Sequence, residues 1–240
     1  MRIQRPGDKI IHIPGGGMGY RHRGPRGGAA AGNWWEAGGA TGCLVAYQPK
    51  GAASYAASLS NLANPGTYDA TEGTAPAWAA LTGWTFDGSN DFLTSGLAGN
   101  NTYSMIVQYS GNIAQTGGIA GLTDGTAVRL NIYPKYTDGN TYLRAGGSST
   151  TTAPAGFAAG NFCVTPAQGY WNGSTFGSAL SGAYSGSTSW PILIGAHNNR
   201  WPLVPTPGNY WAGNILALAI YNDTLTAPEV SAIAAAMAAL

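Results

Sequence analysis

The end of the chain constrains the fold most strongly. Residues 213–221 are predicted to form a strand whose two faces are both apolar, and such a strand has to be covered on both sides. Thr226 and Glu229, three positions apart, form a capping box at the start of a predicted amphipathic helix over residues 226–240. The sequence therefore predicts a central strand with a helix laid over its outer side.

Short strands between turn signals are predicted from about residue 33 to residue 221. Glycine supplies 37 of the 240 residues and charged side chains only 9%, a composition that fits a turn-rich β protein. Roughly eleven strands are predicted, and no helix precedes the last element. The pattern indicates an all-β fold: a two-sheet antiparallel jelly-roll sandwich with a C-terminal α-helix and an extended N-terminal arm.

The arm is marked by its charge. Six basic residues, Arg2, Arg5, Lys9, Arg21, Arg23 and Arg26, lie in the first 26 residues beside one acid, Asp8. Residues 1–32 are therefore predicted to be a basic, Gly-rich arm, and residues 33–240 the jelly-roll domain. Docking of the arm on an oligomeric protein partner is favoured. Nucleic-acid contact and a solvated terminus are the alternatives.

The charge and hydropathy of the chain exclude some classes of protein. A net charge of +1 argues against nucleic-acid binding by the bulk charge of the molecule. Residues 1–32 lack the continuous apolar stretch of a secretory signal peptide, and no segment approaches the ~20 apolar residues of a membrane span. We therefore expect neither a signal peptide nor a transmembrane segment.

Three segments, taken in order, carry a resemblance to a known family. Residues 84–93 contain Phe-Asp-Gly-Ser-Asn-Asp-Phe-Leu between two predicted strands, residues 169–173 read Gly-Tyr-Trp-Asn-Gly, and residues 211–226 lead into the capped helix. In this order they resemble the concanavalin A-like lectin/glucanase superfamily, specifically its laminin-G-like jelly rolls, over about residues 44–240. The resemblance implies a jelly-roll sandwich and says little about the ligand.

A low-charge, Gly/Ala-rich body with this ending also resembles bacteriophage virion components. This implies a structural protein on the virion surface that decorates the capsid, with the major capsid protein as the expected partner of the arm. Such a protein would be a homo-oligomer or bound to a lattice, with glycan binding as an added role. A glycan-binding adhesin, such as a tail-fibre or tail-spike lectin module, is the alternative, and a divergent glycosidase is a third.

Hydrolysis has to be considered because glucanases share this fold. Glycoside hydrolysis needs two carboxylates held ~5–10 Å apart, and the glucanase members carry them as a Glu-x-Asp-x-x-Glu strand. The chain has three glutamates, Glu36, Glu72 and Glu229, none at such a spacing, and Glu229 is used in the helix cap. On this ground the protein is predicted not to be an enzyme and to have no catalytic residues.

A calcium ion is the one cofactor that the sequence offers. Asp87, Asn90 and Asp91 are oxygen donors on a predicted turn, and Ca²⁺ takes six to eight such oxygens from neighbouring loops. The alternative is a hairpin whose aspartate side chains accept hydrogen bonds from their own backbone.

Aromatic and hydrogen-bonding side chains gather near the end of the body. His197, Asn198, Asn199, Arg200, Trp201 and Tyr210 combine the ring platforms and polar groups that recognise sugars. They follow a predicted strand over residues 191–195, so we expect them in a loop at the edge of the sandwich. The pair Trp34 and Trp35 is a second aromatic candidate. In both places the alternative is that the rings anchor a loop or the arm.

Overall fold

The structure is a computed structural model that describes residues 32–111, 117–123, 129–146, 148–152, 157–180, 187–199 and 207–240, with backbone alone at residues 148–152 and 199. The predicted arm over residues 1–32 lies outside these ranges except for Gly32, so the arm and its docking residues stay predictions. In the described residues, no helix is long and apolar enough to cross a membrane.

Two sheets make up the body, and the first has β17 at its centre. Its strands run in the order β13-β12-β11-β6-β17-β4-β3, and β1 also pairs with β17. Their bounds are β13 (Ser174–Phe176), β12 (Gly169–Trp171), β11 (Ala159–Val164), β6 (Ser104–Gly111), β17 (Ala212–Tyr221), β4 (Gly83–Asp87), β3 (Ala77–Ala79) and β1 (Cys43–Tyr47). The prediction of a central final strand is confirmed.

The second sheet runs in the order β10-β9-β8-β7-β14-β5-β2. Its strands are β10 (Ser148–Thr152), β9 (Thr141–Ala145), β8 (Arg129–Tyr133), β7 (Ala120–Thr123), β14 (Ser187–Ile194), β5 (Phe92–Asn100) and β2 (Thr71–Thr74). Beside it, β15 (His197–Asn199) pairs in parallel with β7 and antiparallel with β16 (Pro207–Gly208). The all-β two-sheet sandwich predicted from the sequence is confirmed.

The main core lies between the two sheets. Alternate side chains of each strand enter it, such as Val107 and Ile220 from the first sheet and Leu130 and Ile132 from the second. All four are fully buried, as period-two alternation requires of strands that have one face on a core. Because the core takes these positions, the intervening side chains of β8 and β9 are left for the opposite face of the second sheet.

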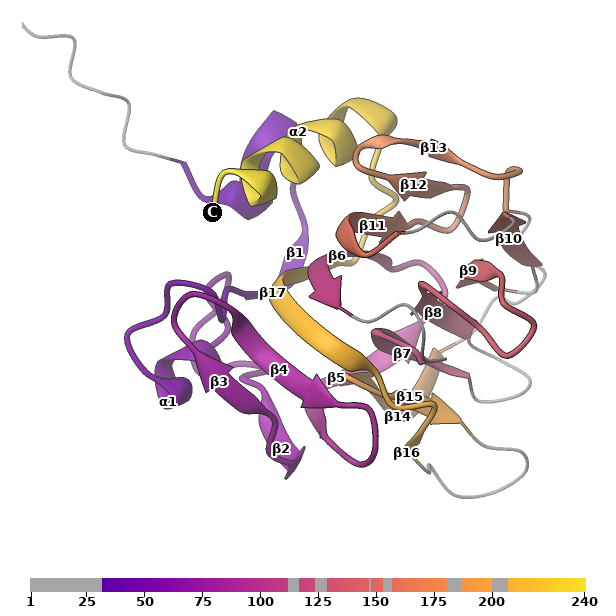
Figure 1. The fold of residues 1–240 in the computed structure, drawn as a ribbon. Coiled ribbons are helices and arrows are strands. Elements are labelled where there is room, and N and C mark those ends of the chain that lie inside the picture. Colours follow the sequence, from indigo (N-terminus) through magenta and orange to yellow (C-terminus); the bar gives the residue numbers. More distant parts are fainter. Residues whose placement is uncertain are drawn as a thin grey trace, which may run out of the picture. The chain divides into compact units, whose positions relative to one another are not determined.

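A smaller core lies on the outer face of β17. There α2 (Ala227–Ala238) and the 3-10 turn η1 (Trp34–Gly39) lie side by side, as Figure 1 shows. The remaining helix is the short α1 (Tyr55–Ser58). Val230 and Ile233 of α2 pack here with Trp34 and Trp35, whose side chains are 7% and 8% exposed. The two tryptophans therefore anchor η1 against α2 and offer little ring surface to a ligand.

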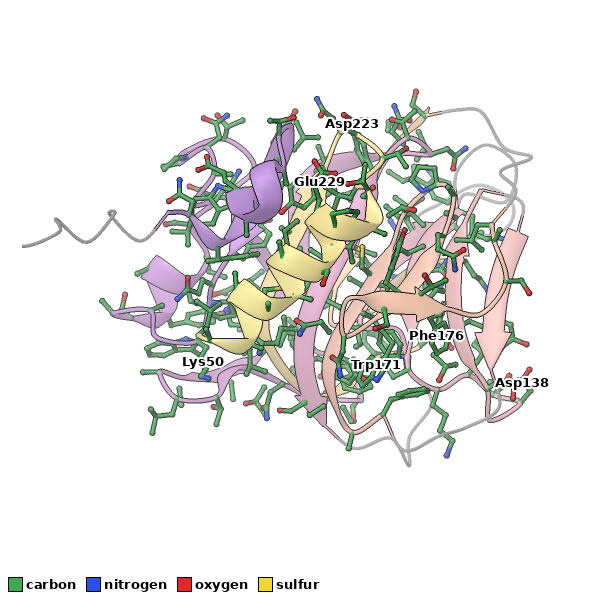
Figure 2. The ribbon with its side chains drawn as sticks, turned by 90° about the horizontal axis from the view of Figure 1, so that it is seen from above. Lys50, Asp138, Trp171, Phe176, Asp223 and Glu229 are labelled. Atoms are coloured by element: carbon green, nitrogen blue, oxygen red, sulfur yellow. The ribbon has the colours of Figure 1, made fainter. Side chains whose placement is uncertain are left out.

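The capping box at the start of α2 forms as the sequence predicts. The backbone N–H and the hydroxyl of Thr226 both donate to Glu229 Oε2 at 2.7 Å, and Glu229 lies at the start of the helix (Figure 2). We expect Glu229→Ala to lower the free energy of unfolding by about 1 kcal/mol, measured by urea denaturation. Glu229→Gln keeps an acceptor oxygen at this position and is the matched control. An equal loss in both variants would contradict the capping role.

A candidate ligand face on strands β8 and β9

One face of the second sheet points away from the core and carries polar and aromatic side chains. Leu130 and Ile132 of β8 and Leu143 of β9 face the core, so the residues between them face the other way. These outward residues are Asn131 and Tyr133 on β8 and Tyr142 and Arg144 on β9. The register pairs Asn131 with Arg144 and Tyr133 with Tyr142, which brings all four together.

Three tyrosine rings surround the Arg144 guanidinium. Its central carbon lies 4.5 Å from the centre of the Tyr142 ring, 4.9 Å from that of Tyr136 and 5.6 Å from that of Tyr133. All three distances fall within the ~6 Å range of cation–π attraction. Adjacent rings meet edge to face, Tyr133 on Tyr136 at 5.2 Å and Tyr136 on Tyr142 at 5.4 Å. We call these four residues the tyrosine–arginine cluster.

The turn between β8 and β9 holds the outermost ring in place. The Tyr142 hydroxyl donates to Asp138 Oδ2 at 2.6 Å, and the Asn140 backbone N–H donates to Asp138 Oδ1 at 2.9 Å. The Tyr142 hydrogen bond is the main cause that lowers the pKa of Asp138. Asp138 is therefore ionised at neutral pH, with its oxygens already accepting hydrogen bonds within the turn.

Next to the cluster, the polar side chains of His197, Thr123 and Asn131 lie close together. His197 Nε2 lies 3.1 Å from Thr123 Oγ1, to which Asn131 Nδ2 donates at 3.1 Å. The His197 ring meets the Tyr133 ring edge to face at 5.3 Å. Burial, followed by the positive charge of Arg144, lowers the pKa of His197 to about 3. The imidazole is therefore neutral at physiological pH.

Several polar atoms on this face have unused hydrogen-bonding capacity. Asn131 Oδ1, His197 Nδ1 and Arg144 Nε are buried and have no hydrogen-bond partner among the described residues. Leaving such a group unpaired costs roughly 1–3 kcal/mol. These atoms mark a buried polar region beside the tyrosine rings, and the half-buried Tyr136, Tyr142 and Arg144 are the groups of the cluster that a ligand can reach.

The predicted glycan-binding residues are only partly at this face. His197 joins the cluster, but it and Asn198 are only 3% and 1% exposed, because the segment forms strand β15 against β7. The prediction of a loop is wrong for these two residues, which lie in a strand. Asn199 is described by its backbone alone, Arg200 and Trp201 lie outside the described residues, and the glycan role of all six residues stays a prediction.

Two other residues of that group, Asn198 and Tyr210, make hydrogen bonds to backbone carbonyl groups outside the cluster. Asn198 Nδ2 donates to the carbonyl of Pro191 at 3.1 Å, which ties β15 to β14. The Tyr210 hydroxyl lies 3.4 Å from the carbonyl of Pro207, so it closes the segment after β16. The sequence analysis missed Tyr133, Tyr142 and Arg144, although the apolar–polar alternation of residues 129–133 and 141–145 would have indicated them.

The predicted calcium residues form a turn between β4 and β5. Asp87 Oδ1 accepts from the backbone N–H groups of Ser89 at 2.7 Å and Asn90 at 3.2 Å, and Asp91 Oδ2 accepts from that of Asp87 at 3.0 Å. These bonds support the alternative in which the carboxylates stabilise the turn. No group of three or more His, Cys, Asp or Glu side chains suited to a metal occurs among the residues described. The calcium site stays a prediction.

A cavity of about 500 Å³ lies between α2 and strands β6 and β11. Its polar lining includes Gln108 and Asn161, whose side-chain oxygens are buried and have no partner in the described structure. The residues of α2 that line it are Ser231 and alanines. It offers neither a charged side chain nor a cluster of rings among its described lining residues, so the tyrosine–arginine cluster is the stronger candidate for a ligand with a specific chemistry.

Comparison with known proteins identifies the fold. No protein-family model matches the sequence, and a search of curated proteins finds no match. Among solved structures, the chain is similar to a mutant Trypanosoma rangeli sialidase displaying trans-sialidase activity (TM-score 0.54, 12% identity), and to the same organism's sialidase in complex with 2,3-difluorosialic acid (TM-score 0.51, 14% identity). Both matches cover 80% of this chain and 32% of the sialidase chain.

Two further structures have lower TM-scores. Domain 4 of a GH43 extracellular arabinanase from Geobacillus stearothermophilus, in complex with arabinotriose, has a TM-score of 0.49 and 17% identity, with 80% of this chain and 98% of that chain covered. A SAP-like pentraxin from Limulus polyphemus has a TM-score of 0.46 and 17% identity over 62% of this chain and 80% of that chain. The likeness to the two sialidases, with TM-scores above 0.5, thus shows a shared β-sandwich fold, and the chain spans about a third of the length of the sialidases it matches.

The comparison corrects one prediction from the sequence. The protein was predicted not to be an enzyme, because the glucanase carboxylate motif is missing. The same fold, however, occurs within the chains of sialidases, and a glucanase motif is not the only way in which a fold can carry catalysis. The exclusion of an enzyme was therefore wrong, and an enzymatic role is compatible with the fold.

Proposed function

We propose that this domain binds carbohydrate on the tyrosine–arginine cluster, which lies beside the buried Asn131 and His197. The observation that carries the proposal is the presence of three contiguous tyrosine rings around a half-buried guanidinium. Aromatic faces pack against the apolar faces of sugar rings, and a few fixed polar groups then orient the hydroxyls. The similarity in fold to sialidases supports this proposal.

The two more accessible rings are expected to make the main contacts. Tyr136 and Tyr142 are each half-buried, whereas Tyr133 is buried. The hydrogen bond from Tyr142 to Asp138 fixes one ring before any ligand arrives, which lowers the entropy cost of binding. The half-buried Arg144 guanidinium would donate a hydrogen bond to a sugar hydroxyl.

A glycan array with the full-length protein tests the proposal. We expect the wild-type protein to bind a defined group of glycans and Tyr136→Ala to bind the same group at least about tenfold more weakly, a loss within the range seen for aromatic contacts at binding sites. Tyr68→Ala is the matched control, because Tyr68 is 40% exposed and lies between α1 and β2, outside the cluster. A wild-type protein that binds no glycan, or equal losses in the two variants, would contradict the proposal.

The virion role that the sequence suggested remains a prediction. It rests on the resemblance to phage proteins and on the basic residues of the arm, which lie outside the described residues. Carbohydrate binding is common to the two alternatives, a capsid decoration protein and a tail-fibre lectin module. It is therefore the part of the function that the described face can support.

A further inference from the structure

The positive charge of Arg144 is not neutralised within the described structure. No carboxylate of the described residues forms an ion pair with its guanidinium, and Asp138, the acid in the adjoining turn, accepts hydrogen bonds from Tyr142 and Asn140. His197 is neutral at physiological pH and brings no negative charge. A half-buried cation without a counter-ion is costly, so this position favours the arrival of an anion.

The tyrosine rings use only part of the bonding capacity of the Arg144 guanidinium. Rings that lie above and below a guanidinium interact with its faces, but its five N–H donors point outward in its own plane. Arg144 Nε is buried and has no acceptor in the described residues. Because Nε is buried and Arg144 as a whole is only half-buried, a ligand would reach the guanidinium at its terminal nitrogens, while the ring contacts hold the group in a fixed orientation.

A fixed guanidinium that is reached at its terminal nitrogens is matched best by a planar or tetrahedral oxyanion. Carboxylate and sulfate accept two parallel N–H···O bonds from one arginine, and such charged pairs are stronger than hydrogen bonds to a neutral hydroxyl. Asn131 lies opposite Arg144 in the register, but its side chain is fully buried. The half-buried guanidinium is therefore the member of this pair that an anionic group can reach.

We infer that the carbohydrate bound here is an acidic one, whose carboxylate or sulfate group pairs with Arg144 while the sugar rings pack on Tyr136 and Tyr142. This inference rests on the proposed function and narrows the class of ligand. The acidic group supplies the specificity. The tyrosine rings supply contact area whose contribution does not depend on the charge of the ligand. The two contributions can therefore be separated by experiment.

Matched pairs of ligands give the first test. The probes are an oligogalacturonide and its methyl ester, and a carrageenan oligosaccharide, whose only anionic groups are sulfates, and its desulfated form. We expect the full-length protein to bind at least one acidic member about 10- to 100-fold more tightly than its neutral partner, with an affinity that falls as NaCl rises. The two pairs distinguish a carboxylate from a sulfate. Poly-glutamate serves as the polyanion without a sugar.

Matched variants give the second test. Arg144→Gln is expected to abolish the preference for the acidic member, and Arg144→Lys to keep part of it, because lysine retains the charge and loses the planar fork. Lys50→Gln removes one positive charge elsewhere, since Lys50 and the Asp138 turn lie at opposite sides of Figure 2. We expect Lys50→Gln to bind like the wild type.

The outcomes separate the inference from the proposed function. If the neutral members bind as tightly as the acidic ones, the inference is wrong and the proposed function stands. If no carbohydrate binds, both are wrong. Poly-glutamate binding equal to that of the acidic glycans would also overturn the inference, because the protein would then recognise negative charge without requiring a sugar. Should Arg144→Gln fail to fold, the ligand pairs and the salt dependence of the wild type still decide the result.

Discussion

Trp84→Ala is expected to lower the free energy of unfolding by about 3–5 kcal/mol. Trp84 lies on β4 with its side chain fully buried in the main core. Its ring packs against the Tyr47 ring at 5.8 Å, and its Nε1–H donates to Ser58 Oγ at 2.8 Å. Alanine would leave a large cavity between the sheets and remove this hydrogen bond, which ties α1 to the sandwich.

Trp84→Phe is the matched control for this prediction. Phenylalanine keeps an aromatic ring in the core, and Ser58 Oγ still donates to the carbonyl of Tyr55 at 2.6 Å. We therefore expect a smaller loss, about 1–2 kcal/mol. Urea denaturation followed by far-ultraviolet circular dichroism measures both variants. A loss below about 1 kcal/mol for Trp84→Ala would contradict the placement of this ring in the core.

The parts of the fold that the sequence predicted correctly are those with strong local signals. The final strand has two apolar faces and ends next to a capping box, and both features depend on residues close together in the chain. Thr226 and Glu229 form the predicted cap, and β17 lies between β6 and β4. Local signals of this strength survive folding because the tertiary contacts agree with them.

The sequence did not predict the strands that form mainly through pairing with adjacent strands. Strand β2 reads Thr-Glu-Gly-Thr and is exposed at all four positions, so no apolar alternation marks it. It forms because it pairs with β5 at the edge of the second sheet. Strand β15 is similar, because its polar residues become a strand through parallel pairing with β7. Pairing between distant segments is not visible in a local pattern.

The sequence predicted only part of the candidate site, because the site also depends on pairing between distant segments. Its His197 was recognised from the types of residue around it, but its partners Asn131 and Arg144 lie far away in the sequence; Asn131 and His197 are 66 positions apart. The register of β8 on β9 and of β15 on β7 brings them to one face. A search for tyrosine and arginine at alternate positions of predicted strands would have found the cluster without fixing its neighbours.

His197 is expected to make the protein less stable as the pH falls from about 6.5 to about 3. Its pKa in the folded protein is about 3, mainly because of burial, whereas an unfolded histidine has a pKa of about 6.5. Between these values the unfolded chain binds a proton that the folded protein does not. The free energy of unfolding therefore decreases with falling pH, by up to about 1.4 kcal/mol per pH unit from this residue.

The variant His197→Gln isolates this contribution from that of the carboxylates. Glutamine cannot titrate but retains an amide that can reach Thr123. The free energy of unfolding of the variant should therefore fall less steeply with decreasing pH in this range. The difference between the two slopes should correspond to at most one bound proton per molecule. Above about pH 7, where the histidine is neutral in both states, the difference between the two proteins should be constant. Urea denaturation across the pH range measures both slopes. Parallel slopes between pH 6.5 and 4 would mean that the folded histidine is protonated as readily as the unfolded one. The imidazole would then carry a positive charge beside Arg144, contrary to the neutral state that burial gives His197.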